Sequence, residues 1–266
     1  MPEFEFLAAS AATGAAAGLL AGLLGVGGGL IIVPALHALF LARQFPPDHL
    51  MHLAIGTSLA SVAFTAVSSA WSHHRHAAVL WRTVRALAPG IVIGAAGGAV
   101  LADRLSSPVL RICFGMFACL VAVQIARNAR PAAGRVLPGI VEMFGAGGAI
   151  GGISTLVGIG GGSLTVPFLL WCNVNLRHAV ATSAACGLPI ALAGAATMIV
   201  VGADHPGLPA GATGYVHWPA ALAIAATSVA CAPLGALLAH RLPLATLRVV
   251  FAILLLAMGL HMVAGA

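Results

Sequence analysis

The sequence predicts an all-α fold: a polytopic transmembrane helical bundle of two inverted repeats, each with a Gly-broken or re-entrant first segment. Three observations lead to this prediction. The chain is 61% hydrophobic and 7% charged, with a mean hydropathy of +1.06, whereas about a quarter of a typical soluble domain is charged. A glycine-rich apolar segment occurs twice, and the arginines gather in short loops.

The glycine-rich segment stands near the start of each half. Residues 22–36 read GLLGVGGGLIIVPAL, and residues 156–169 read LVGIGGGSLTVPFL. The shared positions keep one offset of 133 residues, half the chain length; they are Gly25, Gly27, Gly28, Gly29, Val33 and Pro34, then Gly158, Gly160, Gly161, Gly162, Val166 and Pro167. We therefore expect a first transmembrane repeat over residues 1–130 and a second over residues 131–266, which together form one membrane domain.

Each glycine run predicts a break in an apolar helix, because glycine is a poor helix former. Broken backbone is tolerated at membrane depth only where protein or a watery cavity satisfies it. The helix that restarts after the break presents free N–H groups and its positive end, which suit an anion. Paired breaks at matching positions are typical of a transporter's binding site, so we predict that both runs contact an anionic substrate.

The glycines allow two other interpretations. Small residues also permit close packing of helices, and we assign that role to the glycines at positions 94, 98, 147, 148, 151 and 152. A dinucleotide-binding fingerprint would require a short strand before the glycines and a βαβ pattern. The flanking segments are long and apolar instead, which argues against it.

In the first half, runs of about 20 apolar residues mark the membrane spans. The expected elements are the two arms Leu7–Leu24 and Leu30–Ala42, then the spans Leu53–Ala70, Ala86–Ala102 and Val109–Ala126. The loops between them are Arg43–His52, Trp71–Arg85 and Asp103–Pro108, and the basic segment Arg127–Leu137 joins the halves. The acidic start of the chain lacks the basic region of a signal peptide, so we expect mature structure there.

The second half repeats this order. The expected elements are the arms Pro138–Val157 and Ser163–Trp171, then the spans Ala179–Val201, Trp218–Ala239 and Leu244–Val263. The loops are Cys172–His178, Gly202–His217 and His240–Pro243. The stretch AIGTS at residues 54–58 also returns as AVATS at residues 179–183.

The 12 arginines, with no lysine beside them, predict the orientation. Cytoplasmic loops carry the excess of positive charge, so we place Trp71–Arg85, Arg127–Leu137 and the loop containing Arg177 inside. The arginine-free Gly202–His217 then lies outside. The second broken segment must therefore enter and return, either as a hairpin with the glycines in its bend or as two unequal spans. The same rule explains the net charge of +6 without nucleic acid as a partner.

Further candidate residues are hydroxyls near the breaks. Thr57 and Ser58 match Thr182 and Ser183 across the repeats. These side chains could bind oxyanion oxygens, or they could hydrogen-bond within and between helices. Ser163 follows the second break, where the first copy has Leu30, so the two sides of a shared cavity would differ in polarity.

An ionisable residue inside a membrane span is energetically costly and therefore often has a function. Glu142 is therefore a proton-coupling candidate, with an interfacial pairing to Arg135 as the alternative. The sequence HHRH at residues 73–76 suggests a metal or proton site, but the ligand spacing is weak and we expect a solvated loop. The five scattered cysteines show no metal spacing. We expect no metal and no cofactor.

The chain resembles the TauE/SafE family of sulfite-exporter-like permeases. The resemblance lies in the doubled GxGGGxxxVP segments, in the GTSL after the first, and in the GxxxAxRL…LR pattern that closes each half; it covers nearly the whole chain. It implies transport of small anions, often sulfite or organosulfonates, across the bacterial inner membrane.

We therefore expect a multi-pass permease of the bacterial inner membrane, not an enzyme, that works by alternating access on a small anion in the lipid bilayer. Protons are a possible coupling ion, and a homo-oligomer is possible. An anion channel is the nearer alternative. A membrane-embedded, metal-dependent enzyme that uses the histidine loop is the more distant one.

Overall fold

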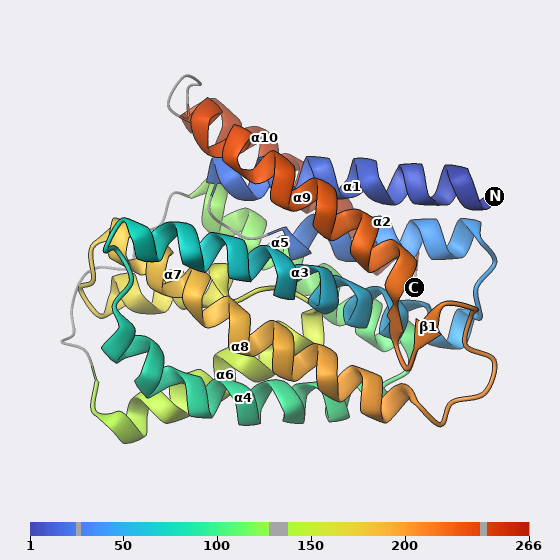
Figure 1. The fold of residues 1–266 in the computed structure, drawn as a ribbon, viewed down its shortest axis with the longest axis horizontal. Helices are drawn as coiled ribbons and strands as arrows, with labels where there is room; N and C mark the ends of the chain where they lie inside the picture. Colours follow the sequence, from blue (N-terminus) through green and yellow to red (C-terminus); the bar gives the residue numbers. More distant parts are fainter. Residues whose placement is uncertain (25–27, 128–137, 240–243, 266) are drawn as a thin grey trace.

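The computed structural model describes residues 1–24, 28–127, 138–239 and 244–265, and most of them are helical (Figure 1). The elements in order are α1 (Glu3–Leu24), α2 (Gly29–Ala42), η1 (Pro47–His49), α3 (Leu50–Arg75), α4 (Trp81–Arg104), α5 (Ser107–Ala126), α6 (Ile140–Val157), α7 (Gly162–Trp171), α8 (Leu176–Gly202), β1 (Ala212–Thr213), β2 (Val216–His217), α9 (Trp218–Ala239) and α10 (Leu244–Ala264). Over the described ranges, seven helices are long and apolar enough to cross a membrane: α1, α3, α4, α5, α6, α8 and α9. The prediction of an all-α polytopic bundle is confirmed.

Most predicted spans match a helix, and α9 coincides with its predicted range. The loop predicted at Trp71–Arg85 is wrong over most of its length, because α3 continues to Arg75 and α4 begins at Trp81. This stretch contains no glycine or proline to end the helix, and basic residues in a last turn favour it through the helix dipole. Hydropathy marks the apolar part of a span and misses its polar ends.

The predicted loop Gly202–His217 contains a short antiparallel hairpin. Ala212 pairs with His217 and Thr213 with Val216, and Gly214 takes a positive φ of 53° in the turn. Tyr215 in that turn is buried. The loop prediction therefore missed a folded element that packs onto α3.

The first broken segment, α1 with α2, forms a hairpin that opens at one end of the bundle (Figure 1). Arg43 directly follows α2, and its Nη1 donates to the carbonyl of Met1 at 3.4 Å. The Arg43 guanidinium also lies 4.7 Å from the ring centroid of Phe6. The chain therefore returns to the end from which α1 started.

The second broken segment, α6 with α7, opens at the opposite end. The start of α6 lies beside the first half of α4, where Gly90 faces the backbone of Phe144. After α7, the Arg177 Nη2 donates to the carbonyl of His76, which directly follows α3, at 3.4 Å. Of the two predicted possibilities, the α6–α7 segment takes the hairpin with the glycines in its bend.

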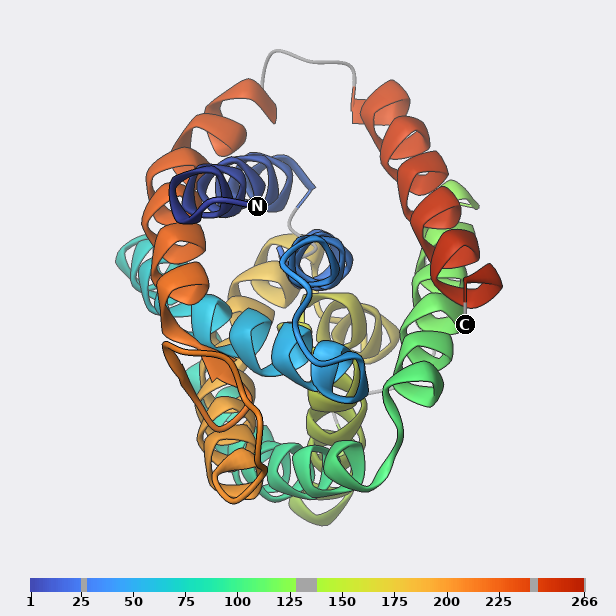
Figure 2. The ribbon, with the colours of Figure 1, turned by 90° about the vertical axis from the view of Figure 1, so that its right-hand side faces the viewer.

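The two halves exchange helices. α1 of the first half packs against α9 of the second, and α6 of the second half packs against α4 of the first. Figure 2 shows α1 beside α9 on one side of the bundle and α10 beside α5 on the other. α3 runs through the centre, where Leu53, Ile55 and Leu59 are fully buried.

Glycine sets the distance within the exchanged pairs. A Cβ on Gly94 of α4 would collide with the carbonyl of Gly148 on α6, and Gly98 stands in the same way against Gly152. Gly147 and Gly151 face the α4 carbonyls of Leu87 and Ile91. The packing role predicted for these four glycines on α4 and α6 is confirmed.

The outward sides of the helices are apolar. Ile93 on α4, Leu120 on α5, Leu222 on α9 and Ile253 on α10 are each more than half exposed. A soluble protein rarely exposes such large contiguous apolar surface, whereas a bilayer accepts it. The bundle therefore presents these faces to lipid.

Candidate functional site

The two helix breaks meet inside the bundle. Gly28 is the N-cap of α2 and Gly29 its first residue. A Cβ on Gly29 would stand 2.8 Å from the Ile159 Cα and 2.9 Å from the Gly158 carbonyl oxygen, so the hairpins touch tip to tip. Gly25 and Gly27 lie outside the described residues.

The second break begins with a turn that requires glycine. α6 ends in a Schellman arrangement, in which the Ile159 N–H donates to the Ser154 carbonyl at 2.8 Å and the Gly158 N–H donates to the Thr155 carbonyl at 3.0 Å. Gly158 takes a φ of 73°, in the left-handed region. The chain then passes Gly160 and restarts as α7 after the N-cap Gly161.

Ser58 ties the first half to this break. It is buried on α3, and its Oγ donates to the Gly158 carbonyl at 2.8 Å. The carbonyl belongs to the left-handed residue, where the helix ladder no longer supplies a donor. Ser58, a predicted site residue, therefore contacts the second break directly.

Thr57 and Thr182 hold the starts of two helices. The Thr57 Oγ1 accepts a hydrogen bond from the N–H of His217 at 3.0 Å, and the Thr182 Oγ1 accepts one from the N–H of Leu80 at 3.1 Å. His217 directly precedes α9 and Leu80 directly precedes α4. The same bond is thus made twice, each time between the two halves.

Hydroxyl groups gather around the second break. Ser163 and Thr165 lie in the first turn of α7, and Ser183 lies on α8. All three are buried, and none of their hydroxyl oxygens has a hydrogen-bond partner among the described residues. Buried hydroxyls normally find a partner, so these three are free to receive a polar ligand.

Packing brings α7 and α8 together at this point. A Cβ on Gly161 would lie 2.9 Å from the Thr165 Oγ1 and 3.9 Å from the Gly187 backbone nitrogen of α8. Ser183 stands one turn before Gly187 and shares its helix face. Thr165 and Ser183 therefore lie at the contact between α7 and α8 beside the break, and Ser163 lies on the first turn of α7.

Sequence reasoning missed two members of this group. Ser154 and Thr155, in the last turn of α6, are fully buried, and their hydroxyl oxygens also lack a partner among the described residues. The signal was available, because the first copy has Ala21 and Gly22 at these positions. The first break is apolar, with Leu30 and Ile32 buried after it.

The electrostatics of the second break favour an anion. α7 begins at Gly162 without a side-chain cap, so its first N–H groups and the positive end of its dipole face the break. Hydroxyl groups add donors that can turn toward the same point. The arrangement can hold a small oxyanion through neutral donors.

Glu142 occupies a different place. It is exposed in the first turn of α6, and its Oε2 accepts a hydrogen bond from the Gly139 N–H at 3.2 Å. An acidic residue at this position stabilises a helix start. The alternative partner Arg135 lies outside the described residues.

The histidines at residues 73–76 lie at the end of α3. The Trp81 Nε1 donates to the His74 Nδ1 at 3.1 Å, and the His76 ring contacts the Ser72 carbonyl at 2.8 Å. Within the described ranges no group of three histidine, cysteine, aspartate or glutamate side chains is placed to hold a metal ion.

Known proteins similar to this chain carry the names of membrane transporters. The family model "Sulfite exporter TauE/SafE" matches residues 10–262. A "Probable membrane transporter protein" of Haemophilus influenzae is 35% identical over 97% of this chain and 98% of its own length. The "Probable membrane transporter protein YunE" of Bacillus subtilis is 28% identical over 94% of both chains.

An archaeal relative, the "Probable membrane transporter protein MJ0441" of Methanocaldococcus jannaschii, is 28% identical over 98% of this chain and 97% of its own. No solved structure matches the chain significantly. The family match covers α2 to α9 completely and most of α1 and α10. This polytopic membrane protein belongs to the TauE/SafE family of transporters.

Proposed function

We propose that this protein is a secondary transporter that binds a small anion at the second helix break. The single observation that carries the proposal is the set of buried, unpartnered hydroxyls of Ser163, Thr165 and Ser183 beside the uncapped start of α7. Polar groups are tolerated inside the membrane where they face a ligand or a water-filled cavity.

The proposed substrate is sulfite or an organosulfonate. The family name speaks of sulfite export, and the donors at the break suit an oxyanion of this size. Several oxygens on one centre can accept from N–H and O–H donors at once. The proposed location is the inner membrane of a bacterium.

The proposed mechanism is alternating access between two inverted repeats. Support comes from the hairpins that open at opposite ends, from the exchanged pairs α1–α9 and α4–α6, and from the matched Thr57 and Thr182 bonds. Two interlocked and equivalent halves can rock about a fixed central site. The tip contact between Gly29 and Gly158 would open and close during the cycle.

The test is flux of labelled sulfite, sulfate and a simple organosulfonate in proteoliposomes of the purified protein. Saturable flux is expected for at least one of them, with competition by the others. Unsaturable conductance would favour a channel instead. Absence of flux for every anion, in protein shown to be folded, would contradict the proposed substrate class.

Variants locate the site. Ser163→Ala and Thr165→Val each remove one donor, so the apparent affinity should fall by about tenfold per lost hydrogen bond, with thermal stability retained. Ser10→Ala is the matched control, since Ser10 is also fully buried with an unpartnered hydroxyl but lies about 20 Å from the hairpin tip along α1. Equal affinities in all three variants would place the substrate elsewhere.

A further inference from the structure

A second polar site lies at one end of the bundle, away from the helix breaks. It is a pocket of about 310 Å³ where η1, α3 and α5 begin, where α4 ends, and where the segment after α8 folds back. Three histidines and an aspartate line it, as do Asp48, Arg104 and Tyr215. Arg104 belongs to the GxxxAxRL pattern that closes the first half, whereas the histidines, the aspartates and Tyr215 are not repeated residues of that pattern.

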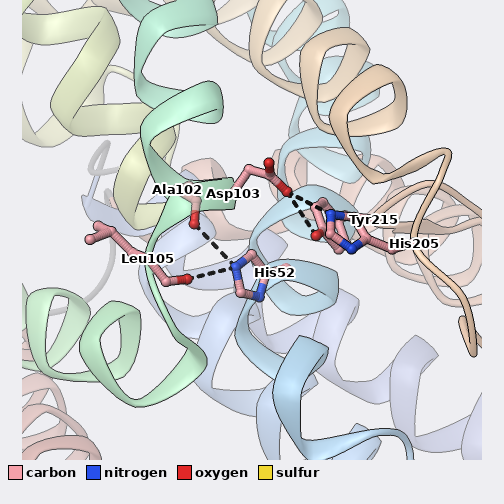
Figure 3. Close-up of polar contacts among 6 residues, drawn as sticks. All are labelled: His52, Ala102, Asp103, Leu105, His205 and Tyr215. Carbon is pink, nitrogen blue, oxygen red and sulfur yellow. Dashed lines mark hydrogen bonds and ion pairs between the residues drawn. The ribbon is translucent and has the colours of Figure 1, made fainter.

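Asp103 is the centre of this pocket (Figure 3). Its Oδ1 accepts a hydrogen bond from the Tyr215 hydroxyl at 2.8 Å and lies 3.1 Å from the His205 Nε2. Asp103 belongs to α4 of the first half, whereas His205 and Tyr215 belong to the second half. The carboxylate therefore joins the halves.

His52 has its tautomer fixed by the backbone. Its Nε2 lies 3.1 Å from the Ala102 carbonyl and 3.0 Å from the Leu105 carbonyl (Figure 3). Carbonyls only accept, so Nε2 carries hydrogen. In the neutral ring Nδ1 is then a bare acceptor, and it is buried without a partner among the described residues. Nδ1 is therefore the atom at which His52 would take up a proton.

The other rings stand close by. The centroid of His49 lies 5.8 Å from that of His52 and 5.1 Å from that of His205. The Tyr215 ring lies between them, 4.9 Å from His52 and 5.4 Å from His205. The His49 Nδ1 is also buried and unpartnered within the described chain. A charge on one of these imidazoles would therefore oppose a charge on its neighbour.

The charges of the pocket favour a single proton. Asp48 faces it from η1, and Asp103 and Arg104 face it from the end of α4. The lining residues that follow, Leu105 to Pro108, are uncharged. From the second half come His205 and Tyr215. Burial and the neighbouring Asp103 raise the pKa of Tyr215, which therefore remains a neutral donor. With neutral histidines the pocket carries one net negative charge, which one proton balances.

We propose that His49, His52 and His205, gathered around Asp103, form a proton-binding site whose occupancy is linked to transport. The link to transport depends on the function proposed above, whereas the existence of the proton site is inferred from the geometry alone. His205 and Tyr215 reach Asp103 across the two halves, so a rocking movement of one half against the other changes the distance between His205 and its counter-charge. A site whose proton affinity differs between two conformations couples the proton to the conformational change.

The first experiment uses the only tyrosine of the chain as a reporter. Protein with ¹³C at the tyrosine ζ-carbon is titrated by NMR through the neutral pH range. The Tyr215 signal should shift as the histidines take up a proton, and this shift should be lost in the double variant His52→Gln and His205→Gln. His76→Gln, which changes an exposed histidine, should retain it. A flat wild-type signal would overturn the proton site.

The second experiment tests the link to transport. In proteoliposomes Asp103→Asn and His52→Gln should lose anion accumulation driven by a proton gradient, but keep anion exchange without a gradient. Accumulation equal to wild type in both variants would overturn the link. If wild type moves no tested anion, the proposed function fails while the tyrosine titration still decides the proton site. Should Asp103→Asn not fold, His205→Gln replaces it.

Discussion

At the scale of single residues, repetition in the sequence has more than one physical cause. Gly158 is glycine because the turn after α6 needs a left-handed residue, and a side chain there would also press on Val33 and Ile55. Thr57 and Thr182 repeat as well, but each holds the start of a helix. The sequence could identify matched hydroxyls, yet it could not separate a ligand contact from a bond to the backbone.

Thr57→Val and Thr182→Val test this distinction. Each change leaves a backbone N–H, of His217 or Leu80, without its acceptor in a buried or partly buried place. An unsatisfied donor costs about 1–3 kcal/mol, so both variants should melt at lower temperature in detergent and keep the substrate affinity of the folded fraction. Thr197→Val is the control, since its hydroxyl bonds only within its own helix. Weaker affinity at unchanged stability would instead make these threonines substrate ligands.

At the scale of elements, helix positions could be predicted and helix ends could not. Apolar runs mark the part of a helix in lipid, so α9 and the arms around the breaks were found closely. α3 extends into polar residues at both ends, and the β1–β2 hairpin is too short for a periodic signal. The packing partner of each helix could not be predicted from the sequence either, because it depends on the exchange of helices between the two halves.

The exchange depends on close approach, which Gly94→Ala should disrupt. The added Cβ would collide with the Gly148 carbonyl on α6, and overpacking of this kind costs about 1–3 kcal/mol. Gly97→Ala is the matched control on the same helix, because open space surrounds a Cβ there. The melting temperature should fall for Gly94→Ala and hold or rise for Gly97→Ala. Equal melting temperatures of the two variants would show that α4 and α6 can move apart without loss of stability.

At the scale of the whole molecule, the doubled glycine motif predicted two broken helical segments at matching positions of the chain. Two breaks at one offset implied two similar halves and a meeting of the breaks, and Gly29 does contact Gly158. The polar pocket around Asp103 could not be predicted, because its residues come from four separate stretches of chain. Only folding brings them together.

The inverted arrangement across the membrane is the prediction that belongs to this scale. His76 follows α3 at one end of the bundle, and Asp204 follows α8 at the other (Figure 1). Arginine counting places the first end in the cytoplasm. With the five native cysteines replaced, His76→Cys should react with an impermeant thiol reagent only from the cytoplasmic side, and Asp204→Cys only from outside. Reaction of both from one side would contradict the fold in the membrane, while reversed sides would keep the inversion and overturn the orientation.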